Sequence, residues 1–260
     1  MKRVICVALA ALLSALLVYP LLAVASSKIG VVLIHGKWGS PKSMVPLARE
    51  LESRQYLVSN AEMAWSDRRL YDLDYPAALK EIEQQARQLR ARGAKRVALA
   101  GQSMGSNAAV AYASSGFDLD GLVILSPGHF LEGGMGKRLR PSIERARSMV
   151  AANRGTDFES FDDINQGKQR SIKVAAATYV SYFDPDGLGA ITKNIKKISK
   201  VVPLLLVIGM ADPFYPESKA MFDSAPPHVL NRYVALDTDH FNMPKVATAE
   251  LLKWLDSFAQ

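Results

Sequence analysis

The ten residues from Arg96 to Gly105, RVALAGQSMG, carry the strongest structural signal in this sequence. Arg96–Ala100 is typical of a buried β-strand, and the small and apolar residues that follow predict a helix that runs to about Ser114. Between strand and helix stands the pattern G-x-S-x-G. A turn this sharp holds its central residue, Ser103, in a strained backbone conformation, and the flanking glycines avoid side-chain collisions.

Apolar strands and periodic helices alternate along most of the chain. We expect strands near residues 29–34, 56–59, 96–100, 121–125, 203–208 and 229–236, and helices near 41–51, 76–93, 104–114 and 244–258. This alternation predicts a mostly parallel sheet of about six strands with helices on both faces. The expected fold class is therefore α/β, in one domain that spans residues 26–260.

Residues 131–200 interrupt the alternation, and we expect them to form a helical cap insertion on the sheet, with an acidic turn at Asp162-Asp163. The segment holds 13 Lys and Arg residues against 8 Asp and Glu residues, so it carries most of the chain's net charge of +7. Four of its lysines fall in one helical stretch: Lys193, Lys196, Lys197 and Lys200. The pattern favours an amphipathic helix with a solvated lysine face, and the alternative is contact with a membrane surface or an anionic polymer.

The first 25 residues have the layout of a secretory signal peptide. Lys2 and Arg3 precede an almost unbroken apolar run, and Ala23-Val24-Ala25 offers small residues at the positions that a signal peptidase reads. We expect cleavage after Ala25 and export through the general secretory route to the periplasm or the exterior. The alternative is an uncleaved membrane anchor, because the apolar run is long enough to span a bilayer.

The composition excludes several classes of protein. Hydrophobic residues make up 49% of the chain and charged residues 22%, which is typical of a globular protein rather than a disordered or multi-span one. The single cysteine, Cys6, lies in the predicted signal peptide, so a disulfide framework, a cysteine nucleophile and a cysteine-ligated zinc site are excluded. A nucleic-acid partner is not expected either, because no basic groove interleaved with aromatic residues is evident.

A nucleophilic serine needs a base, and the base needs a group that orients it. His240, in the loop before the last helix, is the best candidate base. Asp212 follows the apolar strand at residues 203–208, at the edge where parallel sheets place their active sites. Its alternative role is to cap a helix, and Asp237 and Asp239 are substitutes for it as the orienting carboxylate.

The loop after the first strand, His35–Pro41, is expected to complete the site. Backbone amides of Lys37 and Met104 could converge on a carbonyl oxygen as it becomes negative. Trp38 and His129 are expected to line the substrate pocket. For His35 we expect a bracing role in the loop rather than a chemical one.

These motifs resemble those of the α/β-hydrolase superfamily, in particular its compact bacterial esterase and monoacylglycerol-lipase-like branch. The resemblance covers nearly the whole chain after residue 25, with anchors at His35–Pro41, the G-x-S-x-G pentapeptide, Asp212 and His240. It implies a minimal version of the fold, without two amino-terminal strands. It also implies that Ser103 is acylated, that His240 moves the proton and that Asp212 orients His240, without a metal or cofactor.

The sequence therefore predicts a secreted serine hydrolase that cleaves small-molecule carboxylic esters through an acyl-enzyme intermediate. An acyltransferase or a thioesterase would use the same residues. A non-catalytic binding protein on the same scaffold is the alternative from another class, because a fold alone does not establish an activity. The acyl chain length and the oligomeric state stay open.

Overall fold

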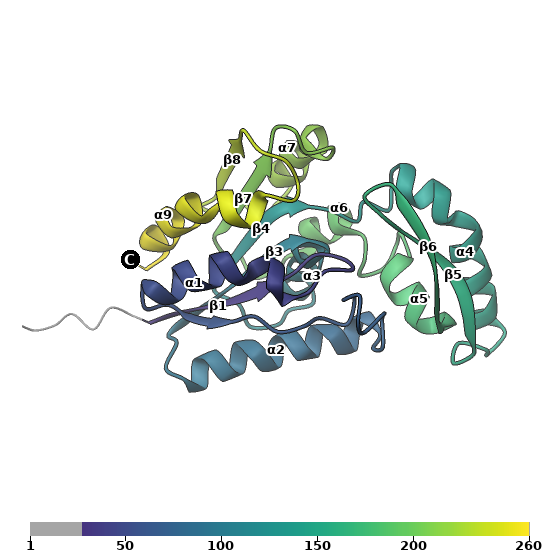
Figure 1. The fold of residues 1–260 in the computed structure, drawn as a ribbon. Helices are drawn as coiled ribbons and strands as arrows, with labels where there is room; N and C mark the ends of the chain where they lie inside the picture. The colour runs from purple at the N-terminus through teal and green to yellow at the C-terminus, as the bar shows by residue number, and fades with distance from the viewer. Residues whose placement is uncertain (1–27, 260) are drawn as a thin grey trace, which may run out of the picture.

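A six-stranded parallel sheet forms the centre of the molecule, in the strand order β2-β1-β3-β4-β7-β8 (Figure 1). The computed structural model describes residues 28–259, so the predicted signal peptide lies outside the described residues. The strands are β1 (Ile29–Ile34), β2 (Leu57–Ser59), β3 (Arg96–Ser103), β4 (Gly121–Pro127), β7 (Leu204–Gly209) and β8 (Arg232–Leu236). The predicted α/β class and the number of strands are confirmed.

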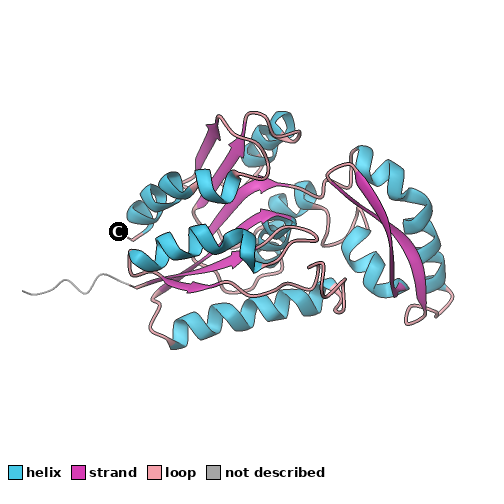
Figure 2. Cartoon of the chain, viewed as in Figure 1, coloured by secondary structure: helices cyan, strands magenta, loops and turns pink. Residues whose placement is uncertain are grey.

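Helices cover both faces of the sheet because side chains along each strand alternate between them (Figure 2). Val31 and Leu33 of β1 pack in one apolar cluster with α1 (Val45–Ser53) and α9 (Thr248–Phe258). Val32 and Ile34 pack in a second cluster on the opposite face. The helices of that cluster include α2 (Tyr75–Ala91), α3 (Met104–Ser114), α6 (Ile191–Asn194) and α7 (Tyr215–Asp223).

Two predicted helices are divided. A 3₁₀ turn, η1 (Pro41–Met44), precedes α1, and the closing helix begins as a separate turn, α8 (Met243–Val246). The basic stretch near residue 195 consists of α6 and a second 3₁₀ turn, η2 (Ile195–Lys197). As predicted, its isoleucines are buried, whereas Lys193 pairs with Asp186 and Lys200 with Asp118. None of the helices within residues 28–259 has the length and apolarity needed to cross a membrane.

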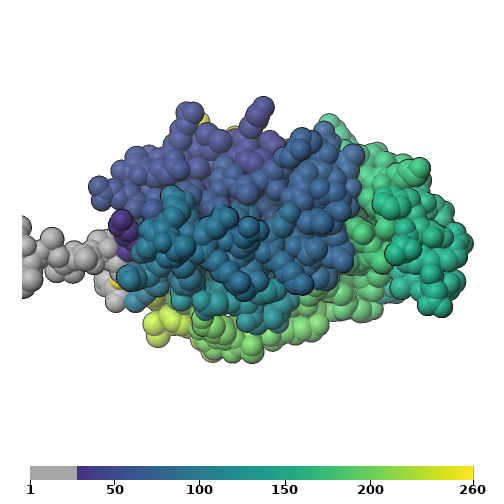
Figure 3. Space-filling view, turned by 90° about the horizontal axis from the view of Figure 1, so that it is seen from below, coloured from purple at the N-terminus to yellow at the C-terminus, as the bar shows by residue number. Residues whose placement is uncertain are grey.

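The cap lies at the carboxyl end of the sheet and packs directly against the core (Figures 1 and 3). It contains α4 (Gly134–Ala151), α5 (Ala176–Phe183) and an antiparallel hairpin of β5 (Phe158–Asn165) and β6 (Lys168–Ala175). The cap thus contains a β-hairpin in addition to the expected helices, and Asp162-Asp163 lies within β5 rather than in the expected turn. The chain reverses instead at Gln166-Gly167, where both residues have positive φ, as a two-residue hairpin turn requires.

Candidate active site

Ser103 occupies a sharp turn between β3 and α3. Its backbone has φ 57° and ψ −118°, a conformation that costs a non-glycine residue about 1–3 kcal/mol. The neighbouring glycines are needed for close backbone packing. A Cβ on Gly101 would overlap the carbonyl of Gly105, and a Cβ on Gly105 would overlap the carbonyl of Ile34. The turn therefore presses the start of α3 against β1 and β3, with Ser103 at its tip.

Asp212 and His240 come from the loops that leave two neighbouring parallel strands, β7 and β8. Backbone hydrogen bonds join the first loop to the end of β8 and to the second loop, since Met210 N donates to Leu236 O at 2.8 Å and Ala211 N to Thr238 O at 3.1 Å. At their ends, His240 Nδ1 donates to Asp212 Oδ2 at 2.7 Å. The sheet thus brings together two residues that are 28 positions apart in the chain.

Asp212 is held as a carboxylate. It is only 3% exposed, and burial alone would raise its pKa. The hydrogen bonds from His240 and from the Phe214 amide, which donates to Oδ1 at 2.9 Å, outweigh burial and lower the pKa below its usual value. Because an ionised carboxylate only accepts, the proton of the neutral imidazole sits on Nδ1, and Nε2 is left as a base.

The other carboxylates considered for this role do not serve it. The Asp239 carboxylate accepts hydrogen bonds from the amides of Phe241 and Asn242 in its own loop. Asp237 is exposed. The capping role proposed for Asp212 is also present, because its bond to the Phe214 amide caps the turn before α7. Asp212 Oδ1 thus caps the turn before α7, while Oδ2 accepts the hydrogen bond that orients His240.

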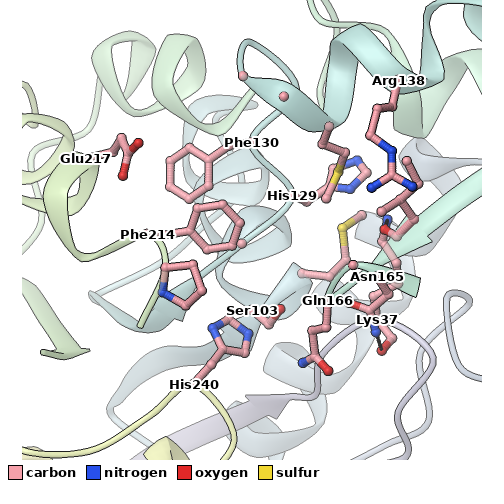
Figure 4. Close-up of a pocket in the computed structure, with 18 of the residues that line it drawn as sticks. Lys37, Ser103, His129, Phe130, Arg138, Asn165, Gln166, Phe214, Glu217 and His240 are labelled. Carbon is pink, nitrogen blue, oxygen red and sulfur yellow. Dashed lines mark hydrogen bonds between the residues drawn. The ribbon is translucent and has the colours of Figure 1, made fainter. Parts of the chain in front are cut away.

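Ser103 and His240 lie next to each other at one end of a cavity of about 930 Å³ (Figure 4). The core and the cap both contribute to its walls. Most of the surface that lines the cavity is apolar, and Met104, Phe130, Met135, Ile164, Pro213 and Phe214 are among the apolar residues there. The lining also includes polar and charged side chains, such as Arg138, Asn165, Gln166 and Glu217.

The two predicted oxyanion donors, Lys37 and Met104, line the same cavity as Ser103. The Lys37 amide donates no hydrogen bond to any residue that the structure describes. Met104 is the first residue of α3, a position whose amide has no acceptor within the helix. Both amides are therefore available to a ligand oxygen.

His35 and His129 are structural in this arrangement. His35 donates from Nδ1 to the Gly36 carbonyl at 2.8 Å and accepts at Nε2 from the Met63 amide at 3.0 Å, so it braces its loop as predicted. His129 lines the cavity but is 3% exposed, and its Nε2 donates to the Tyr182 carbonyl at 2.9 Å. Burial, with a smaller contribution from nearby Lys37, lowers the pKa of His129 to about 3. His129 therefore stays neutral.

Trp38 is not among the residues that line the cavity, contrary to its predicted place in the pocket. Its indole Nε1 donates to Asp163 Oδ2 at 2.7 Å, and the Arg170 guanidinium lies 4.0 Å from its ring. Both partners belong to the cap hairpin. The indole N–H thus finds its acceptor in the hairpin rather than facing the cavity.

Asp163 is the residue that sequence reasoning missed. It is fully buried and accepts three hydrogen bonds of 2.7 Å, from Lys37 Nζ, Trp38 Nε1 and Tyr71 Oη. Burial lowers the pKa of Lys37, and the attraction of Asp163 opposes this. The only signal in the sequence was an acidic pair in an otherwise basic segment. Among residues 28–259 no cluster of His, Asp and Glu is arranged to hold a metal ion.

Comparisons with known proteins agree with this architecture. A family model described as "Alpha/beta hydrolase family" matches residues 31–251. No curated protein matches the sequence. Among solved structures, the chain is similar to the Paleococcus ferrophilus monoacylglycerol lipase, with 18% identity and a TM-score of 0.64 over 88% of this chain and 94% of that chain.

Two further structures give the same result. A structure from the study of the metagenome-derived lipolytic enzymes LipS and LipT has 16% identity and a TM-score of 0.63, over 89% of this chain and 94% of that one. Est1E from Butyrivibrio proteoclasticus, with ferulic acid bound, has 16% identity and a TM-score of 0.60, over 89% and 90%. At identities this low, the three structural matches show a shared fold. The family model, which spans most of the sequence, shows the family. This chain belongs to the alpha/beta hydrolase family.

Proposed function

We propose that this protein is a serine hydrolase that cleaves carboxylic esters through an acyl-enzyme intermediate. The observation that carries the proposal is the 2.7 Å hydrogen bond between His240 and a buried Asp212, on a cavity that Ser103 and His240 share. A strained serine, a histidine of fixed tautomer and free backbone amides are the parts that acyl transfer requires.

In the first half-reaction, Ser103 Oγ attacks the ester carbonyl while His240 Nε2 takes the hydroxyl proton. The amides of Lys37 and Met104 bind the oxygen as it becomes negative. The bond to the alcohol then breaks, and His240 gives its proton to the leaving oxygen. Asp212 stabilises the imidazolium that forms between these two steps.

In the second half-reaction, water replaces the alcohol. His240 removes a proton from the water, which attacks the acyl-serine carbonyl, and the carboxylic acid leaves as Ser103 recovers its proton. The apolar lining of the cavity supports an ester with an apolar acyl or aryl group. A thioester would react by the same steps, and a thioesterase domain from the curacin pathway is also among the similar folds.

The test is labelling of the purified protein with a fluorophosphonate probe, which reacts with an activated serine. We expect labelling of the wild type and none of Ser103→Ala, with at least about a thousandfold loss of p-nitrophenyl ester hydrolysis. Ser115→Ala is the matched control, because Ser115 is an exposed serine at the end of α3. A folded wild type that resists the probe, or a Ser103→Ala variant that keeps turnover, would favour the binding-protein alternative.

A further inference from the structure

The Lys37 side chain lies at the boundary between core and cap. Its Nζ donates to Asp163 Oδ1 at 2.7 Å and to the Ile164 carbonyl at 3.0 Å, and both groups belong to β5. The side chains of Lys37 and Asp163 are almost completely buried. The proposed role of Lys37 needs only its backbone amide. Its side chain nevertheless binds Asp163, which lies 126 positions away in the chain.

A second contact from the same hairpin holds the backbone of Lys37. Asn165 Nδ2 donates to the Lys37 carbonyl at 3.0 Å. The next peptide is held from the core, because the Trp38 amide donates to the Trp65 carbonyl at 2.9 Å. Lys37 is therefore fixed at its side chain and its carbonyl by the cap, while its own amide stays free to bind a ligand.

Asp163 joins the cap to two separate loops of the core. Besides Lys37 it accepts from Trp38, in the same loop, and from Tyr71, in the loop before α2. A buried carboxylate with three donors is stable only while the hairpin and both loops keep this arrangement. The next residues of the hairpin, Ile164 and Asn165, line the cavity (Figure 4).

We propose that the cap hairpin positions the oxyanion-binding amide of Lys37, with Asp163 and Asn165 as its positioning residues. The inference rests on the proposed function, since it gives the Lys37 amide a role in catalysis. The hairpin thus acts on the chemistry as well as on the shape of the pocket. A displaced hairpin would leave Ser103, Asp212 and His240 intact but would release one donor from its position.

The test separates transition-state stabilisation from substrate binding. Asn165→Leu keeps the branched shape of the side chain and removes the donor to the Lys37 carbonyl. We expect kcat to fall about 10- to 100-fold while KM changes less than about threefold, because an oxyanion donor acts mainly in the transition state. A trifluoromethyl ketone, which forms an oxyanion on Ser103, should bind more weakly by the same factor as kcat falls.

Asp163→Asn is the second variant, because it keeps the shape of the side chain and removes the charge that holds Lys37 Nζ. If it folds, it should show the same loss of kcat and of ketone affinity. If it does not fold, Asn165→Leu still decides the question. Lys173→Ala is the control, because Lys173 is an exposed residue on β6 of the same hairpin and should leave both values unchanged.

The proposal is overturned if Asn165→Leu raises KM alone, or leaves kcat and the affinity for the ketone as in the wild type. In either case Asn165 does not position the Lys37 amide for catalysis. If the proposed function itself is wrong, the experiments give other results. The wild type would then not bind the ketone covalently, and Ser103→Ala would not change its activity.

Discussion

His129 is buried as a neutral imidazole, and we expect this single residue to make the fold sensitive to acid. Its pKa is lowered to about 3, chiefly by burial, whereas in the unfolded chain it lies near about 6.5. Between these values the unfolded state binds more protons than the folded state. The free energy of unfolding therefore falls as the pH falls through this range.

We predict that His129→Gln removes much of this acid sensitivity, because glutamine does not titrate and its amide can still donate to the Tyr182 carbonyl. From pH 7 to pH 4.5 the wild type should lose about 2.5 kcal/mol more stability than the variant. Urea denaturation at a series of pH values measures the difference. Parallel stability curves for the two proteins would mean that His129 is already protonated, or exposed, in the folded state.

At the scale of elements, the proposed site depends on how the loops after β7 and β8 pack together. Gly209, the last residue of β7, lies so close to the other loop that a Cβ would overlap the Thr238 carbonyl. Two backbone hydrogen bonds join the first loop to the end of β8 and to the second loop, just before Asp212 and His240. The distance between the two side chains is thus set by backbone contact as well as by their own bond.

Gly209→Ala should force the two loops apart and lower kcat about 100-fold, since a displacement of about 1 Å is enough for such a loss. Steady-state kinetics on an ester that the wild type hydrolyses is the measurement. Gly116→Ala is the control, because Gly116 has φ 79° with no atom near its Cβ position and lies in the loop after α3. It should destabilise the protein by about 1 kcal/mol without a change in kcat. Equal activity in both variants would contradict the argument.

At the scale of the molecule, core and cap share one aromatic cluster. Tyr182 of the cap stacks on Tyr75 of α2 at 4.6 Å between ring centroids and meets Tyr71 edge-on at 4.8 Å. Its hydroxyl donates to the Leu73 carbonyl at 3.0 Å. Together with the bonds of Asp163, these contacts join the cap to the core through buried side chains.

We therefore predict that cap and core unfold together. Thermal unfolding followed by near-UV circular dichroism, which reports the aromatic cluster, should coincide with unfolding followed by far-UV circular dichroism. Loss of the near-UV signal at a lower temperature would show that the cap separates first. That outcome would also weaken the positioning of Lys37 by the hairpin, because the same contacts hold both.

Much of the fold could be predicted from local patterns. Runs of apolar residues mark strands that are buried on both faces, and the glycines beside Ser103 mark a turn where backbones touch. The positions of Asp212 and His240 after successive strands also suggested their meeting, because the carboxyl ends of parallel strands lie at one edge. The sequence also indicates the cap hairpin, because the turn residues Gln166-Gly167 precede a strand in which the apolar residues Ile172 and Val174 alternate with polar ones.

Other features were decided only by the tertiary structure. Periodicity reports which residues are buried but not which groups meet, so it could not show that Asp163 pairs with Lys37 across 126 positions. For the same reason Trp38 was expected in the pocket, although its indole binds the hairpin. The sequence alone determined the sheet, the sharp turn at Ser103 and the order of the proposed catalytic residues. The folded chain decided what holds the oxyanion loop, because a buried charge finds its partner only when distant segments pack together.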